Sequence, residues 1–182
     1  METSPQKNEN KRIVNIAYLE TDLGLMVAAA TDKGICMFEF ADYKLIDLEL
    51  RQLVEEFKAP LVQSGNPYFD MLEKQLGEYF RGERKNFDIP LELVGTEFQK
   101  TVWLSLLQIP YGCTTTYGKQ AGLIGKPSSV RAVANANGKN KISIILPCHR
   151  VIGADGSLTG YGGGIWRKKK LLELEKENVA MR

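Results

Sequence analysis

The first 40 residues alternate short hydrophobic runs with turns. The runs IVNIAYLE, LMVAAAT and ICMFEF are separated by the turn sequences DLG and DKG. Short runs rich in β-branched and aromatic residues, bounded by Gly and Asp, are typical of strands. The pattern therefore predicts three antiparallel strands in a meander at the start of the chain.

Two helices are expected after these strands. LIDLELRQLVEEF has hydrophobic residues at helical spacing, and NPYFDMLEKQLGEYF begins with Asn66 as an N-cap and Pro67 at the first helical position. In the second helix the hydrophobic positions form one stripe, which comprises Phe69, Leu72, Leu76 and Phe80. Such a stripe indicates a face packed on the core and carries no chemistry of its own.

The second half of the chain predicts three shorter helices. Thr96 and Gln99 form a capping box ahead of TEFQKTVWLSLL, which IPYG ends. TTTYGKQAGLIG follows, capped by Thr116, and GKPSS leads into SSVRAVANANG. Two short helices joined by a Gly-containing turn are a helix-turn-helix candidate, although small residues such as Ala132 also suit helix packing. We place a domain boundary before this region, with domains at residues 1–92 and 93–182.

KISIILPCHRVIG predicts a buried strand from Ile142 to Leu146, which Pro147 ends because proline cannot donate a ladder hydrogen bond. Cys148 then lies at a strand end, where reactive groups are common. The alternative is a buried and inert cysteine, which is the usual state of a free cysteine with apolar neighbours.

Composition is typical of a globular protein, with 43% hydrophobic and 25% charged residues. No apolar segment approaches the roughly 20 residues that a membrane-spanning helix needs. The polar start METSPQKNENKR lacks the apolar core of a secretory signal. We expect a frayed N-terminus on a cytoplasmic protein, or a nuclear one if the source is eukaryotic.

The three cysteines, Cys36, Cys113 and Cys148, are odd in number and widely spaced. This usage favours free thiols in a reducing compartment over a disulfide framework. A single histidine and scattered cysteines lack the paired spacings of a zinc site, so no metal is expected.

Charge is divided unevenly along the chain. Residues 1–92 hold 11 Lys and Arg against 17 Asp and Glu, a net charge of −6, whereas residues 93–182 hold 13 against 5, a net charge of +8. Unevenness by chance is one explanation. The other is that the second half binds a polyanion such as nucleic acid.

A nucleophilic Cys148 needs a base or a positive field, because an unperturbed thiol has a pKa near ~8.5. His149 and Arg150 are its nearest candidates. Adjacent side chains point apart, so a water molecule or a tight turn must link Cys148 to His149. The far ring nitrogen then needs an acceptor, and the downstream carboxylates are Asp155, Glu173, Glu175 and Glu177.

PCHRVIG, with GSLTGYGGG downstream and with TTYGKQAG and RAVANANGKN upstream, closely resembles the O6-alkylguanine-DNA alkyltransferases, or methylated-DNA-protein-cysteine methyltransferases. The resemblance spans about Thr96 to Glu175 and is weaker over residues 1–95. It implies an α+β fold: a small ribonuclease-like α/β N-terminal domain followed by a winged-helix-like, helix-turn-helix C-terminal domain.

The resemblance also implies roles for individual residues. Cys148 accepts the alkyl group, His149 takes its proton through a water molecule, Glu175 orients the histidine, and Tyr117 helps to protonate the departing base. Arg131 enters the base stack, Asn140 is the hinge residue, and Val151 and Tyr161 line the guanine pocket. The implied substrate- and DNA-binding set is Arg131, Asn140, Val151, Tyr161, Gly162, Gly163, Thr116, Ser128, Ala132 and Arg150.

The implied activity is direct-reversal DNA repair on double-stranded DNA that contains O6-alkylguanine, with O4-alkylthymine as a second candidate substrate. The thioether formed is a very poor leaving group, so each molecule is expected to react once, as a monomer and without a cofactor. The base must leave the duplex to be reached. Two departures stand out, because Lys141 replaces the usual proline and Ala134 replaces a common glycine.

Two other functions compete with this one. A non-enzymatic lesion-binding protein of the alkyltransferase-like type has another residue at the cysteine position, so Cys148 argues against it. A thiol hydrolase using Cys148 and His149 would need an oxyanion hole, and it leaves the helix-turn-helix candidate and the basic half unexplained.

Overall fold

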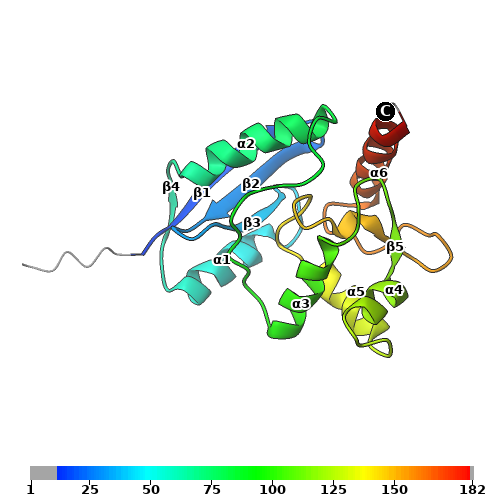
Figure 1. Ribbon diagram of the computed structural model, residues 1–182. Helices are drawn as coiled ribbons and strands as arrows, with labels where there is room; N and C mark the ends of the chain where they lie inside the picture. Colours follow the sequence, from blue (N-terminus) through cyan, green and yellow to red (C-terminus); the bar gives the residue numbers. More distant parts are fainter. Residues whose placement is uncertain (1–11, 181–182) are drawn as a thin grey trace, which may run out of the picture.

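A four-stranded sheet forms the first half of the chain in the computed structural model, which describes residues 12–180 (Figure 1). Residues 1–11 lie outside the described part, and so does the frayed start expected there. The predicted antiparallel meander is confirmed, and a short fourth strand, which the sequence pattern did not predict, pairs in parallel with the first. The strand order is β3-β2-β1-β4, with β1 at Val14–Thr21, β2 at Gly24–Ala30, β3 at Ile35–Phe40 and β4 at Leu61–Gln63.

Two helices cover opposite faces of this sheet, α1 at Ile46–Phe57 and α2 at Pro67–Phe80 (Figure 1). Alternation along β2 explains the arrangement: Val27 and Ala29 pack in the cluster that contains Leu53 of α1, whereas Met26 and Ala28 pack in the cluster that contains α2. The Asn66 cap is confirmed, since its side chain accepts a hydrogen bond from the backbone N–H of Tyr68.

The second half is helical. Thr96 forms the predicted capping box with Gln99, and the Thr116 side chain caps the next helix. A two-stranded parallel pairing, Thr115 with Val151 and Thr116 with Ile152, places the start of that helix beside the chain that leaves Cys148. The elements are α3 at Glu97–Leu106, β5 at Thr115–Thr116, α4 at Tyr117–Leu123, α5 at Val130–Gly138, the 3-10 helix η1 at Cys148–Arg150, β6 at Val151–Ile152, and α6 at Ile165–Ala180.

The strand predicted from Ile142 to Leu146 is wrong. Ile142 makes one isolated parallel bridge to Phe38, after which the chain turns and the backbone N–H of Leu146 donates to the carbonyl of Ile142. All five residues of this segment are buried. A turn that is buried on every side has the same continuous apolar pattern as a buried strand, so the hydrophobic pattern of these residues could not distinguish a turn from a strand.

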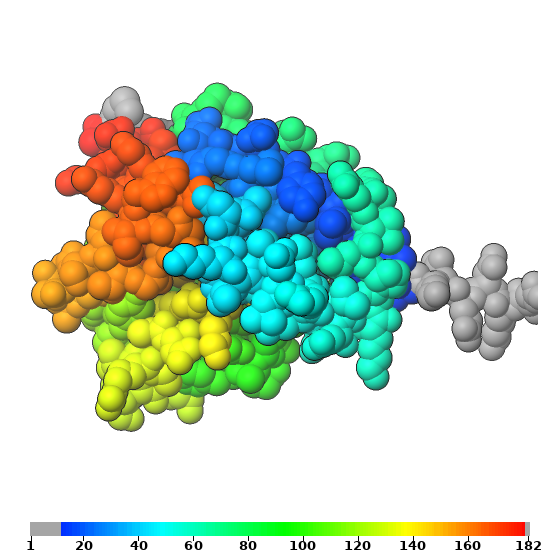
Figure 2. Space-filling model, turned by 180° about the vertical axis from the view of Figure 1, so that it is seen from behind, coloured from blue at the N-terminus to red at the C-terminus, as the bar shows by residue number. Residues whose placement is uncertain are grey.

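The two halves share one hydrophobic core. A single buried cluster contains Phe38 and Phe40 of the sheet together with Leu106 of α3, Leu146 and Leu171 of α6. Figure 2 shows the chain around residue 160, in orange, packed against the cyan segment that follows β3. A smaller cluster, Val102, Ala121, Val133 and Ala136, joins α3, α4 and α5. The sheet therefore supports the segment around Cys148 directly.

Candidate active site

Cys148 begins the 3-10 turn that follows Pro147. Its backbone N–H donates to the carbonyl of Leu146, and its side chain is buried, with 6% exposed. Burial raises the pKa of the thiol to about 11, against the hydrogen bond from Asn140 and the nearby charge of Lys168, which lower it. A thiol in this state is protonated at neutral pH, so any chemistry at Cys148 needs a proton acceptor.

His149 and Glu175 form a buried pair. Nε2 of His149 lies 2.8 Å from Oε1 of Glu175, and neither side chain is exposed. Burial lowers the pKa of His149, so the ring is neutral at pH 7. Burial also acts to raise the pKa of Glu175, but hydrogen bonds and charge from His149 and Arg150 outweigh it and lower that pKa to about 2.

These ionisation states fix the histidine tautomer. An ionised carboxylate only accepts hydrogen bonds, so Nε2 of His149 carries the proton and Nδ1 carries a lone pair. Nδ1 is buried and has no hydrogen-bond partner among residues 12–180. The structure thus presents a neutral imidazole with a free acceptor on the residue next to Cys148, and of the four carboxylates considered from the sequence it selects Glu175.

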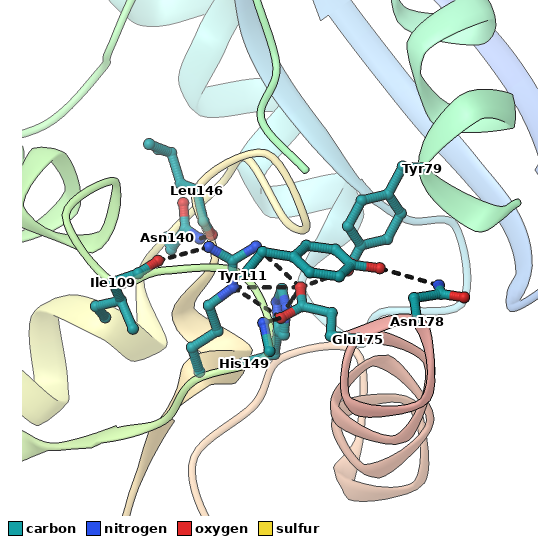
Figure 3. A network of polar contacts seen from close by, with 10 residues as sticks. Tyr79, Ile109, Tyr111, Asn140, Leu146, His149, Glu175 and Asn178 are labelled. Atoms are coloured by element: carbon teal, nitrogen blue, oxygen red, sulfur yellow. Dashed lines mark hydrogen bonds and ion pairs between the residues drawn. The ribbon is translucent and has the colours of Figure 1, made fainter. Parts of the chain in front are cut away.

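Glu175 accepts several further hydrogen bonds from distant parts of the chain (Figure 3). The donors are the Tyr79 hydroxyl at 2.7 Å, the Gly112 backbone N–H at 2.9 Å, and the Arg150 guanidinium at 2.9 and 3.0 Å. Arg150 also donates to the carbonyl of Ile109. Arg150 is buried, so its guanidinium faces this network and not the surface where a DNA contact was expected.

Asn140 connects the end of α5 to the reactive segment. Its Nδ2 donates to the carbonyl of Leu146 at 2.9 Å and to Sγ of Cys148 at 3.2 Å. Its Oδ1 accepts from the backbone N–H of Ile142 at 3.0 Å. The expected hinge residue therefore touches the sulfur and also holds the turn before it.

Lys168 of α6, which sequence reasoning missed, holds both ends of the loop after β6. Its buried Nζ donates to the carbonyls of Val151 at 2.6 Å and Thr159 at 2.7 Å. The Tyr117 hydroxyl donates to the same Thr159 carbonyl at 3.1 Å. Lys168 lies two helical turns before Glu175 on one face of α6, and this spacing was the available signal.

Tyr161 and the glycines after it close the opposite side of the site. The Tyr161 ring is buried and lies edge-on to both His149 and Phe40, with 6.5 Å between ring centroids in each case. A Cβ on Gly163 would come within 2.4 Å of the Phe40 ring, so a larger residue does not fit there. Gly162 is exposed. The buried Arg167 fixes this loop by donating to the Gly163 carbonyl, to Asp42 and to the Leu23 carbonyl.

Three of the expected DNA-binding residues lie apart from this site on the surface. Arg131 and Ala132 are exposed on α5, and Ser128 is exposed in the turn before it. Hydrogen bonds hold α4 and α5 together and against α3. Asn137 of α5 donates to Gln120 of α4 at 2.6 Å, and Trp103 of α3 donates to the Ala136 carbonyl of α5 at 2.7 Å. Within residues 12–180 no group of three or more His, Cys, Asp or Glu side chains is placed to hold a metal ion.

Family models match nearly the whole described chain. Residues 14–93 match the ribonuclease-like domain of 6-O-methylguanine DNA methyltransferase, and residues 97–177 match its DNA-binding domain. No helix within the described residues is long and apolar enough to cross a membrane.

Curated relatives carry one name, methylated-DNA–protein-cysteine methyltransferase. The protein of Mycobacterium tuberculosis is 63% identical over 105 residues, which are 58% of this chain and 64% of that protein, so the alignment spans less than two thirds of its length. The protein of Mycolicibacterium paratuberculosis is 43% identical over 88% of this chain and 91% of its own length. The Methanosarcina barkeri protein is 42% identical over 88% and 96%.

Solved structures agree with these matches. The Mycobacterium tuberculosis O6-methylguanine methyltransferase is 41% identical, with a TM-score of 0.76 over 91% of this chain and 94% of that one. A structure of OGT from the same bacterium in complex with DNA gives a TM-score of 0.77 over 90% and 94%, also at 41% identity.

Proposed function

The chain belongs to the 6-O-methylguanine DNA methyltransferase family, and from this membership we propose that it repairs DNA by moving the alkyl group of O6-alkylguanine onto its own Cys148. One observation carries the proposal. His149 directly follows the buried Cys148 in the chain, its neutral imidazole has Nε2 on the ionised Glu175, and its Nδ1 has no hydrogen-bond partner among residues 12–180.

The reaction is a one-step displacement at carbon. His149 Nδ1 takes the thiol proton through a water molecule, and the sulfur attacks the alkyl carbon. The S–C bond forms while the C–O6 bond breaks, and its electron pair passes to the purine, which a proton then neutralises. Asn140 assists by donating to Sγ, since a hydrogen bond to the sulfur favours the thiolate.

Tyr117 is the donor that we propose for the departing base. Burial raises the pKa of its hydroxyl, which keeps the proton in place at neutral pH. Val151, Tyr161 and Gly163 form the base pocket around it. No cofactor enters, and the thioether product is too poor a leaving group to be released, so we propose a single turnover.

DNA contact is assigned to the exposed side of the α4–α5 pair, as a helix-turn-helix. The base has to leave the stack to reach a buried sulfur, and Arg131 is the residue that we propose takes its place. The net charge of +8 over residues 93–182 supports binding of duplex DNA through this half. We propose domains at residues 1–92 and 93–182, acting together in one monomer.

The free state of Cys36, Cys113 and Cys148 supports a reducing location, which we propose is the cytoplasm, or the nucleus in a eukaryotic source.

Alkylated DNA and mass spectrometry test the assignment of Cys148. The protein is incubated with duplex DNA containing O6-methylguanine, and its peptides are weighed. We expect one methyl group on the peptide that contains Cys148, and none after Cys148→Ala. Cys113→Ser is the matched control, because Cys113 is exposed and should leave transfer unchanged. A methyl group on another residue, or transfer by the Cys148→Ala protein, would overturn the proposal.

A further inference from the structure

The segment before Cys148 is held by the sheet of the other half of the chain. The backbone N–H of Phe38 in β3 donates to the carbonyl of Lys141 at 2.8 Å, and the N–H of Ser143 donates back to the carbonyl of Phe38 at 2.7 Å. The Lys141 side chain adds a bond to Gln52 of α1 at 2.8 Å. Residues 141–143 therefore extend the edge of β3, although they are far away in sequence.

Ile144, the next residue, is held in a strained conformation. Its φ is 70°, in the left-handed region, and it is 1% exposed. A β-branched residue at positive φ is a genuine outlier, because its two Cβ substituents collide with the backbone. Such a conformation persists only where surrounding contacts determine it, so the bonds on either side of Ile144 decide how the chain enters Pro147 and Cys148.

Glu39 supplies the one side-chain bond from β3 to this turn. Its Oε2 accepts from the Ser143 hydroxyl at 2.8 Å, and its Oε1 accepts from the Phe40 backbone N–H at 2.8 Å. Only 1% of Glu39 is exposed. An ionised carboxylate is expensive to bury, so packing alone would be better served by an apolar residue at this position.

We propose that Glu39 is a positioning residue for the alkyl transfer: through Ser143 it holds the strained turn at Ile144, and the turn fixes where Cys148 lies. The inference rests on the proposed role of Cys148 as acceptor. Glu39 touches neither the substrate nor the sulfur, and it acts through the backbone between Ser143 and Cys148.

Position and charge predict opposite effects of removing this carboxylate. The charge of Glu39 raises the pKa of Cys148, so a role as a nearby charge alone would make Glu39→Gln faster. If Glu39 positions the turn, Glu39→Gln is slower, because an amide N–H₂ replaces Oε2, so the Ser143 hydroxyl loses its charged acceptor and has to turn round to accept a weaker hydrogen bond. The direction of the change in rate therefore separates the two roles.

The pH profile gives a second readout. Burial raises the pKa of Glu39 to about 7, against the bonds from Phe40 and Ser143, so the carboxylate is lost as pH falls through that value. The wild-type rate should fall below pH 7 in a step that Glu39→Gln lacks. Other titratable or charged groups face Glu39 as well, and they are Glu49 of α1, Arg167 of α6, Tyr43, Cys148 and Tyr161.

The experiment measures the rate of alkylation at saturating DNA and the half-saturating DNA concentration at pH 8 for Glu39→Gln, Ser143→Ala and the double variant. We expect each single variant to lower the saturated rate about tenfold with the half-saturating concentration unchanged, and the double variant to be no slower than either. Ser143→Ala keeps the test decisive if Glu39→Gln fails to fold, since it removes the hydroxyl without changing a charge.

Glu49→Gln is the matched control. Glu49 is also a buried carboxyl of this half with a pKa raised to about 7, but it has no hydrogen bond to residues 141–146. We expect its rate to match the wild type. Unchanged or faster transfer by folded Glu39→Gln and Ser143→Ala, or an equal loss in Glu49→Gln, would overturn the inference. The site of the methyl group in each variant tests the acceptor separately, so a label away from Cys148 contradicts the proposed function instead.

Discussion

Glu175 is the residue on which the buried charges of the site depend. It is the acceptor for His149, Arg150, Tyr79 and the Gly112 backbone, which come from three separate parts of the chain. Each donor lowers the energy of the ionised carboxylate, and together they outweigh the cost of burying it. One side chain thus sets the tautomer of the histidine and also neutralises the guanidinium beside it.

Glu175→Gln should lower the free energy of unfolding by about 3–5 kcal/mol, because it leaves the buried Arg150 guanidinium without a counter-charge. Denaturant unfolding at pH 7 measures the change. Glu173→Gln in the same helix is the control, since Glu173 pairs only with exposed lysines and should change stability by less than about 0.5 kcal/mol. Equal losses of unfolding free energy in the two variants would show that the network around Glu175 contributes no more to stability than a surface ion pair.

At this scale the sequence indicated the residues proposed to react, and it missed the buried charged residues that hold the segments around them. The PCHRVIG motif led to Cys148 and His149, and resemblance selected Glu175 among several downstream carboxylates. Lys168 and Glu39 were missed because the sequence alone does not show whether a charged residue is buried or exposed. Only the folded chain shows that Glu39 meets Ser143, a residue of the other half.

At the scale of elements, α6 organises the site while α5 faces outward. Arg167, Lys168 and Glu175 of α6 are all buried, and each holds a different segment around Cys148. On α5 the side toward α3 and α4 is buried through Val133 and Ala136, and Arg131 is exposed. α6 therefore holds the segments around Cys148 in place, whereas α5 presents an exposed surface.

Arg131→Ala tests the outward role of α5. Transfer from duplex DNA should fall about tenfold, because nothing then fills the space left by the extruded base, whereas reaction with free O6-benzylguanine should stay within about twofold. Arg51→Ala is the control, since Arg51 is also an exposed arginine but lies on α1. Single-turnover rates on both substrates make the comparison, and equal losses on the two would exclude a role in the duplex.

Most elements were predictable because their signals are local. The caps at Asn66, Thr96 and Thr116 mark helix starts, and the turn sequences DLG and DKG between short hydrophobic runs mark the strands of the meander. β4 was not predicted because it is a strand of three residues that pairs with a single neighbouring strand. The turn at Ile144 was not predicted because hydrogen bonds from β3 and from Asn140 impose its conformation. These bonds have no counterpart in the sequence pattern of residues 142–146.

At the scale of the whole molecule, the shared core carries ionisable groups with opposite pKa shifts. Burial raises the pKa values of Glu39 and Glu49 to about 7. The bonds from His149 and Arg150 outweigh burial at Glu175 and lower its pKa to about 2. The first two favour the folded state when they are protonated, and the third favours it when it is ionised.

Stability should therefore pass through a maximum on the acid side of neutrality. Glu175 contributes stability above its unfolded pKa near 4.5 that is lost as pH falls toward about 2. Glu39 contributes stability below 4.5 that is lost as pH rises to about 7, on the order of 3 kcal/mol. Urea unfolding from pH 3 to 8 checks this, and Glu39→Gln should reduce the decline between pH 4.5 and 7 to the part that Glu49 contributes. A decline that Glu39→Gln leaves intact would assign the loss to other groups.

The position of α6 in the chain also sets the order in which the site is made. A ribosome that has just added Cys148 has yet to translate Arg167, Lys168 and Glu175. Until α6 emerges and packs, His149 lacks its carboxylate and the loop after β6 lacks the two hydrogen bonds from Lys168. Under the proposed single turnover, this order means that Cys148 becomes reactive only after the fold around it is complete.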